Sequence, residues 1–250
     1  LTGANKASYN MNALSGEKKE KFRPDKITLE DGKIYNWRRL KQGSPRDYGN
    51  LVEGTTEITY VYELAKGTVT VKYQDTNGRG FGLADKVIKN NVPTGEDYDT
   101  TTEENKPTRY ETADGKVYEL VTVAKTDGGV QYDANGIRTN VNQASKAEPS
   151  GKVTEGNKEI TYIYELKKGS VVVHYIDTEG NKIKDDRTDK DNVVTGTQYN
   201  VTDATNKPAK ITTPEGKIFE LLTEAKTEGD VQYDATGVKK DSAAVTGRVK

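Results

Sequence analysis

The sequence has 250 residues, a formal net charge of −1 and no cysteine. The lack of cysteine excludes disulfide bonds, thiol catalysis and zinc–thiolate sites. The nearly balanced charge, without a basic stripe or an arginine cluster interleaved with aromatic residues, argues against nucleic acid as a partner. No run of about 18 apolar residues is present, so we expect no membrane insertion.

In chain order, the first candidate element is a polar helix at residues 13–22 (ALSGEKKEKF), although Gly16 interrupts it. From residue 26 onward, short runs of β-branched and aromatic residues predict strands. In residues 57–64 (EITYVYEL) the apolar side chains alternate with polar ones, which indicates a strand with one buried face.

The next predicted strand, residues 68–73 (TVTVKY), places Val69, Val71 and Tyr73 on one face. It is followed by Asp-Thr-Asn-Gly, in which the aspartate can bond the backbone and the glycine can take positive φ. Short helical turns are expected near residues 91–97 and 192–198.

Long segments of the sequence then recur. Residues 66–78 (KGTVTVKYQDTNG) return 102 residues later as KGSVVVHYIDTEG, and residues 53–67 (EGTTEITYVYELAKG) return as EGNKEITYIYELKKG. Residues 114–136 (DGKVYELVTVAKTDGGVQYDANG) return as EGKIFELLTEAKTEGDVQYDATG. Such self-similarity predicts tandem copies of one structural unit.

We therefore predict three repeats. A first repeat, residues 1–66, is shortened and contributes later strands only. A middle repeat, residues 67–166, is complete, and a last repeat, residues 167–250, is without its final strand. Two or three residues join each closing strand to the next opening strand, which predicts an elongated, semi-rigid rod. Neither a signal peptide nor a sorting segment is recognisable, so we expect a longer polypeptide around this sequence.

The repeats resemble the MucBP (mucin-binding protein) family, whose members open with V-x-V-x-Y-x-D-x-x-G and close with V-T-Y-x-Y. The opening matches are Val69, Val71, Tyr73, Asp75 and Gly78, and then Val171, Val173, Tyr175, Asp177 and Gly180. The closing matches are Thr59, Tyr60 and Tyr62, and then Thr161, Tyr162 and Tyr164.

This resemblance implies a mainly β fold of small ubiquitin-like (β-grasp) modules. It also implies a place in a wall-anchored, extracellular surface adhesin of a Gram-positive bacterium, with streptococci as the expected source. The implied partners are host glycoproteins, namely mucin or an extracellular-matrix protein such as fibronectin, bound by a monomeric, elongated protein without a cofactor. The family's motif elements are mostly structural, so they transfer no binding residue.

The single histidine, His174, invites a catalytic or metal-binding interpretation. Its counterpart in the middle repeat is Lys72, which keeps neither the lone pair nor the pKa of a histidine. We therefore predict a solvent-facing strand position. The acidic pairs Asp185–Asp186 and Glu103–Glu104 are adjacent, in segments that we predict to be polar loops, whereas glycosidases need two carboxylates held across a cleft. The sequence predicts no enzyme and no metal site.

Exposed aromatic residues are the remaining ligand candidates, because tyrosine and tryptophan combine contact area with a polar group. Tyr98 and Tyr199 lie at equivalent positions in segments that we predict to be loops, and Trp37 with Arg38 is specific to the first repeat. Ordinary packing is the competing interpretation for each.

Two other functions stay open beside adhesion. The repeats can be a structural stalk that projects a separate adhesive or catalytic head, or a carbohydrate-binding module of a secreted enzyme.

Overall fold

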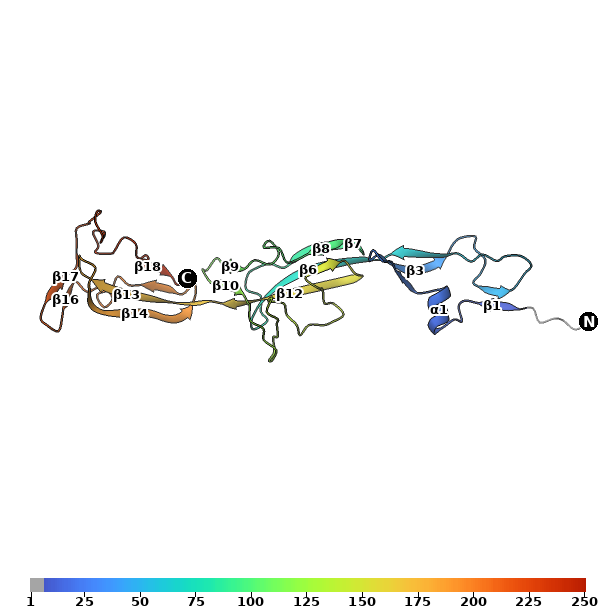
Figure 1. Ribbon diagram of the computed structural model, residues 1–250, viewed down its shortest axis with the longest axis horizontal. Helices are drawn as coiled ribbons and strands as arrows, with labels where there is room; N and C mark the ends of the chain where they lie inside the picture. The colour runs from blue at the N-terminus through green and yellow to red at the C-terminus, as the bar shows by residue number, and fades with distance from the viewer. Residues whose placement is uncertain (1–6) are drawn as a thin grey trace, which may run out of the picture.

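The computed structural model describes residues 7–250 and is built almost entirely of β-strands; within this range the only α-helix is α1, Gly16–Phe22. Figure 1 shows the strands of the three repeats following one another along the longest axis of the molecule. No helix in this range is long and apolar enough to cross a membrane. The predicted fold class, mainly β with tandem modules, is confirmed; the β-grasp arrangement and the rod stay predictions.

The first repeat holds two small sheets. In one, β1 pairs with β4; in the other, the order is β2-β3-β5. Helix α1 begins after Ser15. Glu17 lies in its first turn and lysines lie in its last turn, and charges placed in this way interact favourably with the helix dipole. The strands are β1 Ser8–Asn10, β2 Lys26–Thr28, β3 Ile34–Leu40, β4 Tyr48–Asn50 and β5 Tyr60–Leu64.

The middle repeat is organised around a five-stranded sheet with the order β7-β6-β12-β10-β9. Its opening strand β6 and closing strand β12 are neighbours and run parallel, with Gly67 opposite Gly156 and Tyr73 opposite Tyr162. A separate pair, β8 and β11, forms a small second sheet. The strands are β6 Lys66–Asp75, β7 Lys86–Pro93, β8 Asp97–Asp99, β9 Arg109–Glu111, β10 Val117–Leu120, β11 Ser150–Lys152 and β12 Gly156–Leu166.

The core of the middle repeat lies on the face that the alternation of β6 predicts. Val69, Val71 and Tyr73 are buried there, together with Tyr162 and Tyr164 from β12. Aromatic rings fill the space between them: the Phe81 ring stacks on the Tyr118 ring at 4.3 Å between centroids. The hydroxyls of Tyr73, Tyr162 and Tyr164 each donate to a backbone carbonyl, as Tyr73 does to that of Asn105 over 2.6 Å, so these three phenols are paired although they are buried.

The last repeat has counterparts of β6 to β11, arranged as three two-stranded sheets, β13-β14, β15-β18 and β16-β17. β13 follows β12 after a single residue, Lys167, as β6 follows β5 after Ala65. The strands are β13 Lys168–Ile176, β14 Lys182–Val194, β15 Gln198–Asn200, β16 Lys210–Thr212, β17 Ile218–Glu220 and β18 Thr246–Arg248.

The predicted helical turns near residues 91–97 and 192–198 are wrong. Strands β7 and β14 continue to Pro93 and Val194, and a turn at Gly95 or Gly196 then leads into the next strand. Asn91 and Asn192 have φ of 49° and 47°, a left-handed conformation that asparagine tolerates better than most residues. Each asparagine therefore takes a left-handed conformation inside β7 or β14 without ending the strand.

Candidate functional site

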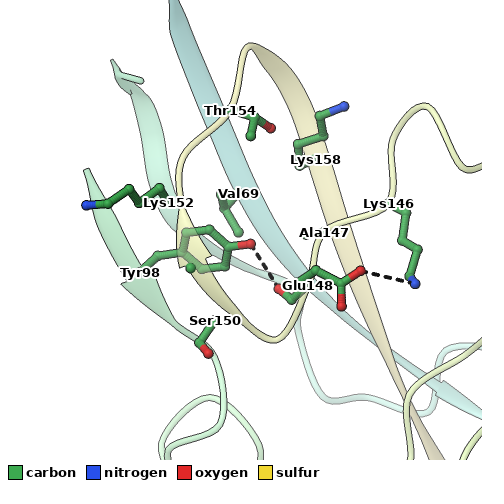
Figure 2. Close-up of a pocket in the computed structure, with 10 residues that line it drawn as sticks. Val69, Tyr98, Lys146, Ala147, Glu148, Ser150, Lys152, Thr154 and Lys158 are labelled. Carbon is green, nitrogen blue, oxygen red and sulfur yellow. Dashed lines mark hydrogen bonds and ion pairs between the residues drawn. The ribbon is translucent and has the colours of Figure 1, made fainter. Parts of the chain in front are cut away.

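A hollow of about 190 Å³ lies on the middle repeat beside Tyr98. Figure 2 shows the Tyr98 side chain pointing its hydroxyl towards Glu148, whose carboxylate faces Lys146. The hollow is lined by Val69, Tyr98, Lys146, Ala147, Glu148, Ser150, Gly151, Lys152, Thr154 and Lys158. It is therefore formed where β6, β8 and β12 meet the segment that carries β11.

Tyr98 lies on strand β8, opposite Gly151 of β11, and not in the loop that the sequence predicts. Its hydroxyl donates to the carbonyl of Glu148 at 3.0 Å, a residue 50 positions away. Burial raises the pKa of Tyr98, and the nearby Glu148 carboxylate adds to that effect. The phenol is thus a structural donor that also forms one wall of the hollow.

Tyr199 repeats this arrangement in the last repeat, again on a strand. It lies on β15 opposite Gly247 of β18, and its hydroxyl donates to the carbonyl of Ala244 at 2.9 Å. Sequence comparison missed a third copy, Tyr9, which lies opposite Gly49 and donates to the carbonyl of Arg46. The Tyr-Asn that the segments Ser-Tyr-Asn (residues 8–10) and Gln-Tyr-Asn (residues 198–200) share could have indicated that Tyr9 and Tyr199 are equivalent.

Lysines dominate the charge around the hollow. Lys146 pairs with Glu148 at 3.2 Å and Lys152 pairs with Asp97 at 3.1 Å. The Lys158 ammonium donates to the backbone carbonyl of Ala144, and no carboxylate in residues 7–250 lies within ion-pair distance of it. The hollow therefore offers a cation, a hydroxyl and an aromatic edge, a set that can hold polar or anionic groups.

Trp37 and Arg38 lie in different surroundings within the first repeat. The half-buried Trp37 ring lies 5.2 Å from the Arg23 guanidinium, in a cation–π contact. Arg38 is 60% exposed at an irregularity of β3, pairs with Glu63, and lines a second hollow of about 270 Å³. The structure brings none of the four predicted candidates together into one site.

His174 is a surface strand residue, as predicted. Its side chain is 67% exposed and its Nδ1 atom lies 3.0 Å from Asp186. At the equivalent position Lys72 pairs with Glu159 at 2.8 Å, so each of the two side chains contacts a carboxylate on a neighbouring strand. Residues 7–250 contain no group of three or more histidines and carboxylates that could hold a metal ion.

The predicted Asp-Gly turns are also confirmed. A carboxylate oxygen of Asp75 accepts from the backbone N–H groups of Asn77 and Arg79, while Gly78 has a φ of 79°. Asp177 makes the same pair of hydrogen bonds to Glu179 and Asn181. These carboxylates are occupied by the backbone of their own turn.

Equivalent hydrogen bonds of two threonines connect successive repeats. The hydroxyl oxygen of Thr94 accepts from the backbone N–H of Ile34 at 2.8 Å, and that of Thr195 accepts from Val117 at 2.7 Å. Both threonines are 1% exposed. In each case a residue after the opening hairpin of one repeat bonds the hairpin of the preceding repeat.

Glycines allow these backbones to approach closely. Gly95 and Gly196 have φ of 91° and 85°, and each lies against the β-turn of the preceding repeat. A Cβ atom at Gly196 would lie 2.8 Å from the carbonyl oxygen of Asp114; one at Gly95 would lie 3.1 Å from that of Asp31. We call each contact of a Thr-Gly pair with the preceding turn a joint.

The first joint has an additional polar clamp. Glu155, next to the closing strand of the middle repeat, pairs with Lys26 and accepts from the Asn36 side chain, both in the first repeat. These two contacts hold the pKa of Glu155 below its usual value, with Lys26 as the larger cause. The clamp adds side-chain contacts of opposite charge to a boundary that the Thr94 hydroxyl and the close backbone approach at Gly95 otherwise form.

Comparison with known proteins identifies two copies of one domain family in the chain. The MucBP domain family model matches residues 68–165 and 170–247. The chain is 38% identical over 211 residues to the Muramidase-released protein of Streptococcus suis; the match covers 83% of this chain and 16% of that protein.

Among solved structures, the comparison finds the Streptococcal High Identity Repeats in Tandem (SHIRT) domains 3-4 from a cell surface protein. The TM-score is 0.23 at 7% identity, with 65% of this chain and 79% of that chain covered. The family assignment rests on the two matches of the MucBP model, which together span well over half of the sequence. The chain belongs to the MucBP domain family.

Proposed function

We propose that this chain is a non-enzymatic stalk segment in the extracellular part of a wall-anchored surface protein, where it projects other parts of that protein from the cell. The observation that carries the proposal is the joint that recurs between successive repeats. A segment whose function is spacing needs the same contact at each boundary, and here Thr94 and Thr195 make equivalent hydrogen bonds.

The joints favour fixed angles for two physical reasons. A single residue, Ala65 or Lys167, separates the closing strand of one repeat from the opening strand of the next, which leaves little chain to bend. Each joint also buries a threonine hydroxyl, and opening it would leave a backbone N–H without an acceptor unless water entered. Successive monomeric repeats would then form an elongated rod.

A second candidate function is adhesion to a host glycoprotein, either mucin or fibronectin. The hollow beside Tyr98 favours it, because no carboxylate in the described part of the chain lies within ion-pair distance of the Lys158 ammonium, which can meet an anionic group of a ligand. A shallow site of this kind binds weakly by itself. Tethered copies would raise the effective concentration and make such contacts useful.

Capture of ligand by the immobilised chain separates the two functions. Beads that carry the chain are incubated with mucin or fibronectin at micromolar concentration, beside beads that carry Lys158→Glu or the control Lys168→Glu, which changes an exposed residue outside the hollow. The stalk proposal expects no retention above bare beads. Retention by the parent chain overturns it, and retention that only Lys158→Glu abolishes assigns adhesion to the hollow.

A further inference from the structure

The two strands that connect the middle repeat to its neighbours lie side by side. A single residue, Ala65, separates β5 from β6, and a single residue, Lys167, separates β12 from β13. β6 and β12 are hydrogen-bonded neighbours with no strand between them, and Figure 1 shows both extending along the longest axis of the molecule. Tension along the backbone therefore enters this repeat at one end of β6 and leaves it at one end of β12.

The parallel direction of β6 and β12 decides how such tension acts on them. Gly67 lies opposite Gly156 at the end where the chain enters the repeat. The ladder continues over nine residue pairs, and its last pair, Asp75 with Tyr164, lies at the end where the chain leaves. Pulling on the chain therefore slides the two strands past each other and loads all nine pairs together. Antiparallel neighbours would instead be peeled apart one pair at a time.

Buried side chains shield the β6–β12 ladder from water on both faces. On one face Val71 of β6 and Tyr162 of β12 are both 0% exposed and belong to the same core. On the other face Ile163 is 0% exposed and packs against Val121 and Val130. Water cannot replace the backbone hydrogen bonds of this ladder as they break, so rupture leaves donors and acceptors without partners.

Further contacts oppose a sliding movement of β12. On the edge away from β6, the N–H of Ile163 donates to the carbonyl of Gly136 at 2.8 Å, and the last residues of β12 pair with β10. Across the ladder itself, Lys72 of β6 pairs with Glu159 of β12 at 2.8 Å. Movement of β12 along β6 would therefore break bonds on both edges of β12.

We propose that the β6–β12 ladder is a mechanical element that keeps the middle repeat folded under tension along the chain. This inference rests on the proposed stalk, because a segment that projects other parts of a protein from the cell carries the forces that act on them. It is independent of the angle of the joints, since the covalent chain delivers tension at Ala65 and Lys167 at any angle. The direction of loading, and not the equilibrium stability alone, then sets the force at which the repeat unfolds.

Optical-tweezers measurements on the full chain, held by DNA handles on two introduced cysteines, test the direction of loading. The sequence has no cysteine, so each pair of substitutions defines the two points of attachment. Lys66→Cys with Lys168→Cys pulls β6 and β12 lengthwise, as tension along the chain does. Lys66→Cys with Asn157→Cys peels them apart from the end where Gly67 lies opposite Gly156. All three substituted positions are exposed.

Unfolding should lengthen the tether by about 30 nm for either pair of cysteines, because they enclose similar lengths of chain. At the same loading rate we expect the lengthwise pull to need about threefold more force or more, because the residue pairs share the load instead of breaking in turn. Equal forces in the two directions, or a lower force for the lengthwise pull, would overturn this proposal. Either result would leave the joints, and with them the stalk, untouched.

Two buried valines separate the strength of the ladder from general stability. Val71 lies in the ladder and is 0% exposed, whereas Val117 of β10 lies outside it and is 2% exposed. Alanine at either position leaves a cavity and should lower the stability measured by urea denaturation. Only Val71→Ala should also lower the force of the lengthwise pull. An equal loss of force in both variants would show that this force reports general stability, and would refute the proposal.

Discussion

The hydroxyl oxygen of Thr195 accepts a hydrogen bond from the backbone N–H of Val117, 2.7 Å away and 78 residues earlier in the chain. Thr195 also donates to the carbonyl of Lys167 at 3.1 Å, so one buried hydroxyl connects two repeats to the segment that joins them. The same contact recurs at Thr94 with Ile34. The proposed stalk depends on such contacts, because they would have to hold each boundary at a defined angle.

Thr195→Val keeps the shape of the side chain and removes this hydrogen bond. The N–H of Val117 then stays buried without an acceptor, and we expect the free energy of unfolding to fall by about 1–3 kcal/mol. Urea denaturation of the full chain measures it. The control Thr205→Val, at an exposed position, should change stability by about 0.5 kcal/mol or less. Equal effects of the two substitutions would show that the hydrogen bond of the Thr195 hydroxyl does not stabilise the joint.

Gly196→Ala and Gly216→Ala form a matched pair that separates backbone strain from contact at the joint. Both glycines have positive φ, 85° and 83°, so each alanine carries a strain of about 1–2 kcal/mol. Only Gly196 is close to another repeat, whereas a Cβ atom at Gly216 meets nothing within 4 Å.

We therefore expect Gly196→Ala to lower the free energy of unfolding more than Gly216→Ala does. It should also change the small-angle X-ray scattering profile, because the two repeats can no longer approach each other. Gly216→Ala should leave that profile as it is. An unchanged profile for both variants would show that the close approach at Gly196 does not set the angle.

Alkaline pH should destabilise the middle repeat through its buried tyrosines. Burial raises the pKa of Tyr73 to about 12, and burial likewise raises the pKa of Tyr164. The folded state favours the neutral phenol, so this contribution is complete below the ordinary pKa of about 10 and is lost as the pH rises through about 12.

The free energy of unfolding should thus be level near about pH 9 and fall between about pH 10 and 12. Chemical denaturation at successive pH values, followed by phenolate absorbance, measures this profile. Tyr73→Phe removes the titrating group and should make the decline shallower, although it also removes the hydrogen bond to Asn105. A level profile across this range would contradict the buried state of these phenols.

His174→Lys introduces the residue that stands at the equivalent position of the middle repeat, Lys72. The exposed His174–Asp186 contact would be replaced by a lysine–aspartate pair of the kind made by Lys72 and Glu159. Exposed ion pairs contribute little, so stability should change by about 0.5 kcal/mol or less. A large loss measured by thermal denaturation would show that the imidazole has a role beyond a surface pair.

Local patterns were sufficient for the opening strands and for the aspartate turns that follow them. The alternation of Val69, Val71 and Tyr73 predicts their common buried face, and the Asp75 turn follows from the chemistry of neighbouring residues. Both features depend on interactions within a few positions or on one face of one strand. Comparison of the repeats also placed His174 correctly at the surface.

The joints and the tyrosine positions could not be predicted in this way. Thr94 bonds a residue 60 positions away and Tyr98 bonds one 50 positions away, so no local pattern contains their partners. The repeats revealed that Tyr98 and Tyr199 are equivalent without revealing that each packs in a strand pair. Trp37 and Arg38 are adjacent in the sequence, but Trp37 contacts Arg23 whereas Arg38 pairs with Glu63, and neither partner is within ten residues of them.

The distance between two spin labels on successive repeats tests the stalk most directly. The chain has no cysteine, so Glu111→Cys with Thr212→Cys introduces the only two thiols, at exposed positions on β9 and β16. Pulsed electron–electron double resonance then reports the distribution of distances across the second joint. A joint that holds the repeats at a fixed angle predicts one narrow distribution, which Gly196→Ala broadens. A broad distribution in the parent chain would show that the joint does not hold the repeats at a fixed angle, and would contradict the stalk.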